Sequence, residues 1–491
     1  MKLGELAGRI PGAVLAGAGD VEIAAVTHDS RRAGPGSLFV AIRGLTADGN
    51  DFVEAALKRG AAAVASEAAP RGGAPWLVVP DAREALAILS AAVLGEPAES
   101  LELVGVTGTN GKTTTTYLID AALRAAGRKV SLLGTIQYRI GERLAEAVRT
   151  TPESSDLQGL FREMVDAGSR YAVLEVSSHS LALKRVHGCR FRVAVFTNLT
   201  RDHLDFHGDM DSYFAAKRVL FDTLLREDGH AIVNAEDDRA AELVRLARGR
   251  VWTYATDRDA DLRAEGIVLS LEGTRFRALT PAGALDVETP LLGRFNAENI
   301  LAALGAALAL GLPAEDALRG IESVAQIPGR LERVSTGQDF TVVVDYAHTD
   351  DALRNLLETV RDLGPRRVIT VFGCGGDRDR TKRPLMGAVA SRLSDVAIVT
   401  SDNPRSEPPE AILEDIQRGM GRQSRAEHHA IVDRREAIAR GLELAGPGDV
   451  VVVAGKGHET YQVLRDRTIP FDDRQVVRDL LRRLPVKSGK A

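Results

Sequence analysis

Cysteine is nearly absent from this 491-residue chain, which contains only Cys189 and Cys374. Two cysteines so far apart in the sequence exclude a disulfide framework and a cysteine-based metal site. They fit a reducing compartment, and we therefore expect a cytoplasmic protein. The first residues, Met-Lys-Leu-Gly-Glu-Leu-Ala, include an acidic residue and lack a long apolar core, so no signal peptide is predicted.

Long hydrophobic runs and a strong charge imbalance are also missing. The longest apolar stretch covers residues 300–312, is rich in alanine and is followed by Pro313. It predicts a buried helix, because a membrane span needs about 20 residues. The net charge of -5 argues against nucleic acid or a membrane as the main partner. With 44% hydrophobic residues, the chain has enough apolar side chains for several cores, and its length predicts about two to four domains.

The first of three segments covers residues 1–98. Short strands at 37–42 and 76–79 and a helix near 52–59 predict a small mixed α/β unit. A polar linker is expected at 96–100.

The other two segments alternate strands with helices. In residues 99–327, apolar strands at 171–176 and 193–198 are each followed by a helical pattern, which predicts a largely parallel sheet covered by helices. Residues 328–491 predict a second open α/β sheet, in which ligands contact the carboxyl ends of the strands. Its expected strands are 341–345, 367–372, 396–401 and 449–454.

A phosphate-binding loop is predicted by the motif Val-Gly-Val-Thr-Gly-Thr-Asn-Gly-Lys-Thr-Thr-Thr, which reads as a strand, a glycine loop and a helix. Gly108 and Gly111 let backbone N–H groups approach phosphate oxygens. Lys112 can reach the β and γ phosphates, and the Thr113 hydroxyl can bind Mg²⁺. Val106 replaces the first glycine of the general pattern, so the match is to a variant. A tight turn with a capping threonine is the alternative, but it does not explain the lysine. We therefore predict ATP binding.

Polar residues also follow two strands of the second segment. Glu175 ends an apolar strand, where it would be either a metal ligand or a helix-capping acid. His203 and Asp205 lie on the next loop, where a histidine binds a metal or a phosphoryl oxygen, or is simply solvated. Tyr213 and Lys217 share one face of a helix, and spacing alone favours a solvent-exposed Lys217.

Three polar clusters follow strands of the third segment. Residues 373–380 offer backbone amides and guanidinium groups to an anion. Residues 402–405, Asp-Asn-Pro-Arg, form a turn that leaves Arg405 unexplained. Residues 455–459, Gly-Lys-Gly-His-Glu, follow another strand. Because all three clusters lie at strand ends, we expect them to converge on one crevice.

Together, the motifs resemble those of the ATP-dependent Mur ligases of bacterial peptidoglycan synthesis. The resemblance covers all three segments and is strongest to the branch that adds the third amino acid to UDP-N-acetylmuramoyl-L-alanyl-D-glutamate. The matching motifs, in family order, are residues 107–114, 175–179, 198–207, 296–299, 329–330, 345–348, 373–384 and 455–459.

The resemblance implies three α/β domains: a UDP-substrate-binding domain at 1–98, a central P-loop ATPase domain with a parallel sheet at 99–327, and a Rossmann-like amino-acid-binding domain at 328–491. The residues expected to bind ATP are Gly108, Thr109, Asn110, Gly111, Lys112, Thr113, Thr114, Asn296, Asn299, Arg330 and Asp345. Those expected to bind the UDP-substrate are Ser30, Leu45, Thr46, Ala47, Thr150, Thr151, Ser177 and Arg185.

The resemblance also implies a magnesium site and an amino-acid site. Thr113, Glu175, His203 and Lys217 would hold Mg²⁺, with Lys217 modified to a carbamate. Lys112, Glu175, His203 and Lys217 would be the catalytic residues. The amino acid would contact Arg378, Asp402, Asn403, Pro404, Arg405, Gly455 and Glu459. One departure is Leu183, where some members carry a glutamine that contacts the substrate.

The implied reaction is the ATP-dependent addition of meso-2,6-diaminopimelate through an acyl phosphate. Diaminopimelate is favoured over lysine because Arg405 and Glu459 offer partners for a distal carboxylate and ammonium, while Arg378 can hold the other carboxylate. We expect a monomer with small-molecule substrates, no nucleic acid and no membrane. Three alternatives remain. Other branches of the family either lack the Asp-Asn-Pro-Arg cluster or, like folylpolyglutamate synthase, usually have Gly-Lys-Gly-Ser in place of Gly-Lys-Thr-Thr. The remaining two are a P-loop switch without a third substrate and an inactive scaffold.

Overall fold

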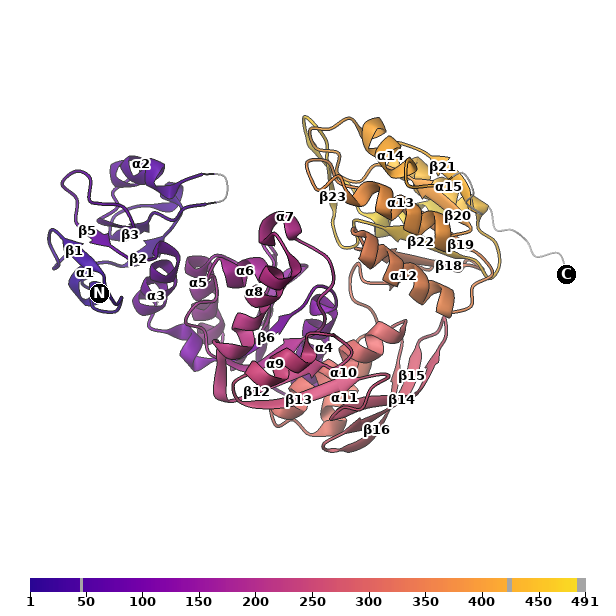
Figure 1. Ribbon diagram of the computed structural model, residues 1–491, viewed down its shortest axis with the longest axis horizontal. Helices are drawn as coiled ribbons and strands as arrows, with labels where there is room; N and C mark the ends of the chain where they lie inside the picture. The colour runs from indigo at the N-terminus through magenta and orange to yellow at the C-terminus, as the bar shows by residue number, and fades with distance from the viewer. Residues whose placement is uncertain (45–46, 422–425, 484–491) are drawn as a thin grey trace.

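Three β-sheets organise the computed structural model, which describes residues 1–44, 47–421 and 426–483. The sheets have five, eleven and six strands, and follow one another along the chain. The first and third parts lie at opposite ends of the central part (Figure 1). The predicted three-part α/β fold is confirmed, while the boundaries at residues 98 and 327 stay predictions.

The first part is a five-stranded sheet of order β1-β5-β4-β3-β2, parallel except for β1. Its strands are β1 Val14–Ala16, β2 Ala25–Thr27, β3 Ser37–Val40, β4 Ala63–Ser66 and β5 Trp76–Val78. Its helices are α1 Leu3–Ala7, α2 Val53–Lys58 and α3 Ala82–Val93, with 3-10 turns at Ser30–Arg32 and Gly49–Phe52. The expected linker contains a further 3-10 turn, Pro97–Ser100, because Pro97 presets a helical φ at its start.

The central sheet has the order β16-β15-β14-β13-β12-β11-β6-β10-β7-β8-β9. The seven strands from β14 to β7 in this order are parallel. The edge strands β15 and β16 on one side, and β8 and β9 on the other, pair antiparallel. These antiparallel edges were not predicted from the sequence. The inner parallel strands β6, β7, β10 and β11 are almost wholly buried because helices cover both faces of the sheet. Strand β15 instead alternates buried and exposed residues, as expected at a half-solvated edge.

The central strands are β6 Glu102–Thr107, β7 Val130–Leu133, β8 Gln137–Ile140, β9 Arg143–Glu146, β10 Tyr171–Glu175, β11 Phe191–Phe196, β12 Leu225–Asn234, β13 Arg250–Ala255, β14 Leu262–Leu269, β15 Thr274–Thr280 and β16 Gly283–Thr289. The helices are α4 Lys112–Ala125, α5 Ser154–Asp166, α6 Ser178–Ala182, α7 Leu204–His207, α8 Met210–Asp222, α9 Ala240–Leu246, α10 Arg294–Ala309 and α11 Ala314–Glu322. Helix α10 contains most of the predicted buried apolar segment and packs in the core beside α4.

The third sheet has the order β17-β18-β22-β19-β20-β21, parallel except for β17. Its strands are β17 Glu332–Arg333, β18 Thr341–Asp345, β19 Val368–Phe372, β20 Val396–Val399, β21 Glu427–Ala430 and β22 Val450–Ala454, with a separate hairpin of β23 Tyr461–Val463 and β24 Thr468–Pro470. The helices are α12 Asp350–Asp362, α13 Lys382–Leu393, α14 Pro409–Gln417, α15 Arg434–Leu444 and α16 Asp473–Leu481.

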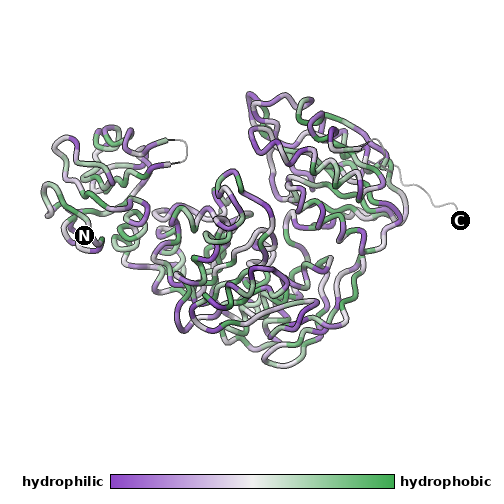
Figure 2. The backbone as a smooth tube through the Cα atoms, viewed as in Figure 1, coloured by the Kyte–Doolittle hydropathy of each residue, from purple (hydrophilic) through white to green (hydrophobic). Residues whose placement is uncertain are grey.

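Hydrophobic residues lie inside each part, between sheet and helices (Figure 2). In the third part, α12, α13 and α14 cover one face of the sheet, while α15 and α16 cover the other. This arrangement leaves the carboxyl ends of the parallel strands free to carry polar loops. Within the described ranges, no helix is both long and apolar enough to cross a membrane.

Candidate functional site

The predicted phosphate loop connects β6 to α4. Gly108 has a φ of 147° and Gly111 a φ of 85°, in the region that favours glycine. A Cβ atom on Gly108 would collide with the Thr197 hydroxyl, and one on Gly111 would lie 2.5 Å from the Asn299 amide oxygen. Helix α4 spans 14 residues, so its N-terminus presents free N–H groups and a positive dipole to this loop. The loop therefore has the geometry of an anion site.

Lys112 folds back over the same loop. Its Nζ donates to the carbonyl oxygens of Gly108 at 2.9 Å and Thr109 at 2.8 Å. Burial lowers the pKa of Lys112, while Glu175 opposes this shift. Thr113 and Thr114 are buried in the first turn of α4. A phosphate in the loop would offer the Lys112 ammonium a stronger acceptor than these carbonyls.

Lys217 reaches the loop from α8. Its side chain is 1% exposed, and its Nζ donates to the Gly108 carbonyl at 2.8 Å and lies 4.4 Å from the centre of the Tyr213 ring. Burial, together with the positive charge of Lys112, lowers the pKa of Lys217 well below its usual value. The spacing-based expectation of a solvent-exposed lysine was wrong, because this face of α8 packs on the loop.

Glu175 ends β10 beside the strand that leads into the phosphate loop. Both carboxylate oxygens are occupied: the Thr135 amide donates to one at 2.8 Å and the Thr135 hydroxyl to the other at 2.9 Å. The Thr135 hydroxyl also lies 3.0 Å from that of Thr150. The chain thus places a buried carboxylate at the predicted edge of the sheet, held by a threonine that sequence reasoning missed.

His203 precedes α7 with a φ of 53°. Its Nδ1 lies 3.3 Å from Asp202, and its ring packs edge-on against His179 at 4.7 Å. Although the His203 side chain is 42% exposed, partial desolvation lowers its pKa to about 4, so the imidazole is neutral near pH 7 and has a lone pair for a metal. In the part of the chain that the structure describes, no three His, Cys, Asp or Glu residues form a metal-binding group. Glu175 and His203 would thus need phosphate oxygens or waters as further ligands, which suits Mg²⁺.

Thr151 and Ser177 meet next to Glu175. The Thr151 hydroxyl donates to the Glu175 carbonyl at 2.8 Å and accepts from the Ser177 amide at 3.2 Å. Arg185 donates to the Thr151 carbonyl at 3.0 Å and pairs with Glu153 at 2.7 Å. Three predicted UDP-substrate residues are therefore one hydrogen-bonded group at the edge of the phosphate site.

The remaining predicted UDP-substrate residues belong to the first part. Ser30 starts a 3-10 turn beside the junction with α5, where His28 bonds to the Ser155 hydroxyl at 2.9 Å. Ala47 is exposed, and its carbonyl accepts from the Gly44 amide at 2.8 Å. Leu45 and Thr46 lie outside the described residues.

Asn296 and Asn299 are buried on α10 behind α4. Asn299 accepts from the Thr115 hydroxyl at 3.2 Å and donates to Asn296 at 3.0 Å. Asn296 in turn donates to the Leu292 carbonyl at 2.8 Å. The two side-chain amides stabilise the first turn of α4. A contact with ATP would be made in addition to these structural hydrogen bonds.

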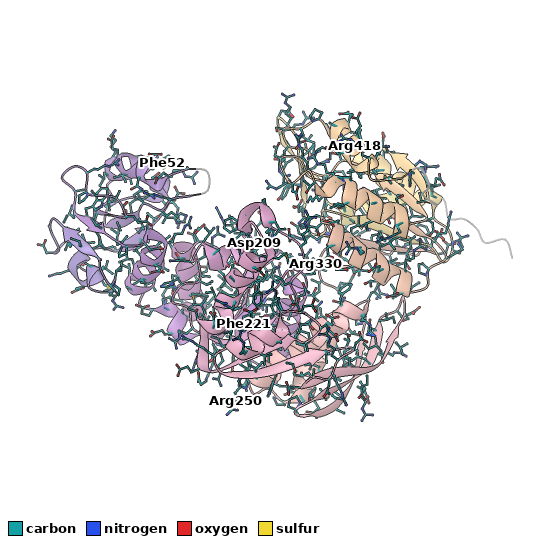
Figure 3. The ribbon with its side chains drawn as sticks, in the orientation of Figure 1. Phe52, Asp209, Phe221, Arg250, Arg330 and Arg418 are labelled. Carbon is teal, nitrogen blue, oxygen red and sulfur yellow. The ribbon has the colours of Figure 1, made fainter. Side chains whose placement is uncertain are left out.

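Arg330 links the third part to the phosphate site, between the two parts (Figure 3). Its Nη2 donates to the Thr113 hydroxyl at 3.2 Å, and its guanidinium stacks 4.6 Å from the centre of the Tyr346 ring. Asp345 accepts from the amides of Leu331 at 2.7 Å and Ala347 at 2.8 Å. Asp345 therefore orders the loop around Arg330. The stacking of Tyr346 on Arg330 was not predicted from the sequence.

The loops after β20 and β22 form the second half of the site. Glu459 accepts from Asn403 Nδ2 and Lys456 Nζ, both at 3.0 Å and both on the same oxygen. Lys456 is fully buried and was not predicted. A Cβ atom on Gly455 would lie 2.6 Å from the Asp402 carboxylate, so these two loops touch. The predicted convergence of the two loops is therefore observed.

Arg405 has a φ of 51° and donates to the Gly376 carbonyl at 2.8 Å. Gly376 also packs against the Pro404 carbonyl, with no room for a side chain. Arg405 thus joins the Gly373 cluster to the Asp-Asn-Pro-Arg turn. Arg378 is exposed, and its guanidinium donates to the Asp377 carbonyl at 3.2 Å rather than to a residue of this group.

Models of the Mur ligases match most of the chain. The Mur ligase middle domain matches residues 106–307, the glutamate ligase domain 329–457, and the Mur ligase catalytic domain 22–94. The chain belongs to the Mur ligase family. This Mur ligase is 50% identical over 488 residues to the UDP-N-acetylmuramoyl-L-alanyl-D-glutamate--2,6-diaminopimelate ligase of Solibacter usitatus, covering 98% of each chain. It is 48% identical to that of Geobacillus thermodenitrificans, over 97% of this chain and 99% of the relative.

Solved structures agree with this assignment. A structure of UDP-N-acetylmuramoyl-L-alanyl-D-glutamate--2,6-diaminopimelate ligase superposes with a TM-score of 0.71 at 35% identity, over 98% of this Mur ligase and 99% of that chain. MurF from Acinetobacter baumannii superposes with a TM-score of 0.64 at 21% identity, over 93% of each chain, which shows the shared fold alone.

Proposed function

We propose that this Mur ligase joins meso-2,6-diaminopimelate to UDP-N-acetylmuramoyl-L-alanyl-D-glutamate in peptidoglycan precursor synthesis, at the expense of ATP. The observation that carries the proposal is the full-length similarity to diaminopimelate ligases, at 50% identity. The phosphate loop of the central part and the Arg405–Glu459 group of the third part are the two halves that such a reaction requires.

ATP would bind at the loop of residues 108–114, with Arg330 and Asp345 contributed by the third part. Mg²⁺ would be held by Thr113, Glu175 and His203, together with phosphate oxygens, and it would supply positive charge to the transferring phosphoryl group. The buried carboxylate and the neutral imidazole fit this ion. Lys217 fits only after chemical change, because an ammonium cannot bind a cation.

Carbamylation would make Lys217 a metal ligand. The neutral amine attacks CO₂, an N–C bond forms and a proton is released, which leaves a two-oxygen anion. The lowered pKa of Lys217 favours the neutral amine that this step needs. The new group can no longer donate three N–H bonds, so its contact with the Gly108 carbonyl would be rearranged.

The reaction begins with transfer of the γ-phosphoryl group to the D-glutamate γ-carboxylate. Lys112 would face the phosphoryl oxygens and stabilise the charge that accumulates on them. The amine of diaminopimelate then attacks the acyl phosphate, and a tetrahedral intermediate expels phosphate to leave an amide. Holding the two reactants between the central and third parts makes this attack effectively intramolecular.

The amino acid would be recognised by opposite charges at its distal end. Arg405 offers a planar, bidentate partner for a carboxylate. Among the described residues, both hydrogen bonds to Glu459 end on the same oxygen, so its other oxygen would accept from an ammonium. Asp402, Asn403 and Gly455 shape the contact between the two loops, whereas Pro404 packs against Gly376 in the loop after β19. Arg378 is exposed and would have to turn inward to hold the second carboxylate.

The UDP-substrate would extend from the first part to the phosphate site. Ser30 and the loop with Ala47 would contact its uridine end, whereas the hydrogen-bonded group of Thr151, Ser177 and Arg185, with Thr150 nearby, would position its peptide end. Leu183 lies at the C-terminal end of α6, where it offers no hydrogen-bonding side chain. We further propose a monomer that acts in the cytoplasm, where ATP is available and Cys189 and Cys374 stay reduced.

One assay tests the proposal against its alternatives. ADP release should require both the UDP-muramoyl dipeptide and diaminopimelate, and should fail with either alone. A P-loop switch would hydrolyse ATP without an amino acid, and an inactive scaffold would release none. Another branch of the family would show the same ATP dependence with a different UDP-muramoyl acceptor or amino acid.

A further inference from the structure

A buried ion pair lies behind the loops of the amino-acid site. Arg434 is the first residue of α15 and Asp473 the first residue of α16, and neither side chain is exposed to solvent. Nε and Nη2 of Arg434 donate to the two Asp473 oxygens at 2.8 and 2.7 Å. Such a bidentate pair fixes the plane of the guanidinium as well as its position.

The same guanidinium binds two backbone carbonyls. Nη2 also donates to the Ala454 carbonyl at 3.0 Å, and Nη1 donates to the Ser401 carbonyl at 3.4 Å. Ala454 directly precedes the Gly-Lys-Gly-His-Glu loop that ends in Glu459. Ser401 directly precedes the Asp-Asn-Pro-Arg turn that carries Arg405. Each carbonyl therefore lies immediately before one recognition loop.

These two loops have no direct strand pairing between them. In the sheet, β19 lies between β22 and β20. The guanidinium therefore connects the last residue of β22 to the chain just after β20, across the end of β19. The loops are nevertheless in close contact. A Cβ atom on Gly373, which follows β19, would collide with the Thr400 carbonyl, and one on Gly455 would nearly touch the Asp402 carboxylate. In a cluster packed this closely, a shift of one strand end moves its loop.

We propose that Arg434, locked by Asp473, is a positioning residue for the amino acid. It sets the spacing between the loops that carry Arg405 and Glu459, and therefore the spacing between the partners of the distal carboxylate and the distal ammonium. Arg434 is fully buried and touches no substrate. The inference rests on the proposed function, because it assumes that these loops recognise diaminopimelate.

The chemistry of arginine explains why this residue type occupies the position. Arginine has five N–H donors in a rigid plane, enough to bind a carboxylate and two carbonyls at once. Lysine keeps the charge but presents its donors from a single atom, so it pairs with Asp473 without holding both strand ends. A misplacement of about 1 Å at a reacting group costs on the order of 100-fold in rate.

The test compares two variants with a matched control. Arg434→Lys keeps the buried charge pair and removes the bridging geometry. The double variant Arg434→Met with Asp473→Leu removes both charges together, a change that often leaves stability near the wild-type value. Arg440→Lys, an exposed arginine on the same helix, is the control.

For both test variants we expect KM for diaminopimelate to rise about 10-fold or more, with the thermal midpoint of the double variant close to that of wild type. KM values for ATP and the UDP-substrate, and all values for Arg440→Lys, should stay at wild-type levels. Wild-type KM for diaminopimelate in either folded variant would overturn the inference. Loss of folding in Arg434→Lys would also overturn the inference, because Arg434 and Asp473 would then stabilise the fold of the third part rather than the spacing of the two loops. Failure of the proposed function would instead appear in the wild-type enzyme, as no ADP release with diaminopimelate.

Discussion

Lys112 and Lys217 donate to the same atom, the carbonyl oxygen of Gly108, at 2.9 and 2.8 Å. Two ammonium groups on one acceptor repel each other, and burial strengthens the repulsion. The pKa of Lys217 is lowered well below its usual value as a result of burial and of the nearby Lys112 charge. An anion in the loop, or conversion of Lys217 to an anion, would relieve the repulsion. We therefore expect this arrangement to favour phosphate binding in the loop and carbamylation of Lys217.

Lys112→Ala should abolish ligation without unfolding the protein. Removing a charged donor from a developing oxyanion typically costs about 3–4 kcal/mol, or on the order of 10²–10³ in kcat. UDP-substrate binding, measured by calorimetry, should stay unchanged. Lys58→Ala, an exposed lysine in the first part, is the control. Near-normal turnover of Lys112→Ala would remove the loop from the chemistry.

Lys217→Ala should lose most activity, and a small carboxylate such as acetate should restore part of it. The added acid would replace the anion that a carbamate on Lys217 is proposed to supply to Mg²⁺. Wild-type activity should fall in CO₂-free buffer and return with bicarbonate. A high-resolution density map of the substrate complex should show additional atoms beyond Nζ. An unmodified Lys217 side chain in that complex would contradict the carbamate.

Arg405→Ala should raise KM for diaminopimelate while KM values for ATP and the UDP-substrate change little. L-lysine lacks the distal carboxylate and would leave the guanidinium without its partner, so wild-type kcat/KM should favour diaminopimelate by about 100-fold or more. Arg418→Ala, an exposed arginine of the same part, is the control. Equal use of L-lysine by the wild-type enzyme would show that Arg405 does not select the substrate.

Acid should destabilise the third part through His458. Burial and then Arg330 lower the pKa of His458 to about 3. An unfolded histidine titrates near 6.5, so below that pH the unfolded chain binds a proton that the folded chain does not, and stability falls as pH drops from 6.5 toward 3. His458→Gln should reduce the loss of unfolding free energy between pH 7 and 5 by about 1–2 kcal/mol. Denaturant unfolding at both pH values measures this difference, with His187→Gln as the control. An unchanged pH dependence would show that His458 titrates normally in the folded protein.

The third part should close over bound ATP. Arg330 and Asp345 belong to the junction with the central part, and Arg330 already contacts Thr113. Substrates that bind both sides of the junction favour the closed arrangement. Small-angle scattering should therefore give a smaller radius of gyration with ATP and the UDP-substrate than without them. Identical curves would mean that the free enzyme is already closed.

Elements that depend on one short stretch of sequence could be predicted correctly. Gly108, Gly111 and Lys112 lie in one short motif between an apolar strand and a helix, and the structure has the loop that this order predicts. The predicted strand at 341–345 matches β18, because a short run of valines bounded by polar residues strongly favours a strand. Antiparallel edge strands such as β15 were missed, because their alternating pattern is weak and their pairing depends on distant residues.

Contacts between distant segments could not be predicted from spacing. Lys217 was expected on the surface, but α8 lies against a loop more than one hundred residues away in the sequence. Thr135 supports Glu175 from a loop with no motif of its own. Lys456 had a visible signal, a lysine between two glycines at a strand end, yet only the fold shows that it pairs with Glu459. Arg434 had no such signal, since a helix-start arginine is usually solvated.

The central claim is that ATP activates the D-glutamate γ-carboxylate before an amide forms with diaminopimelate. It is tested most directly with UDP-substrate carrying ¹⁸O in both oxygens of that carboxylate. Phosphoryl transfer to one oxygen, followed by loss of phosphate, moves that oxygen into inorganic phosphate and leaves the other in the new amide. Mass spectrometry should therefore find one ¹⁸O in each phosphate released with the tripeptide product. Unlabelled phosphate alongside that product would contradict the acyl phosphate.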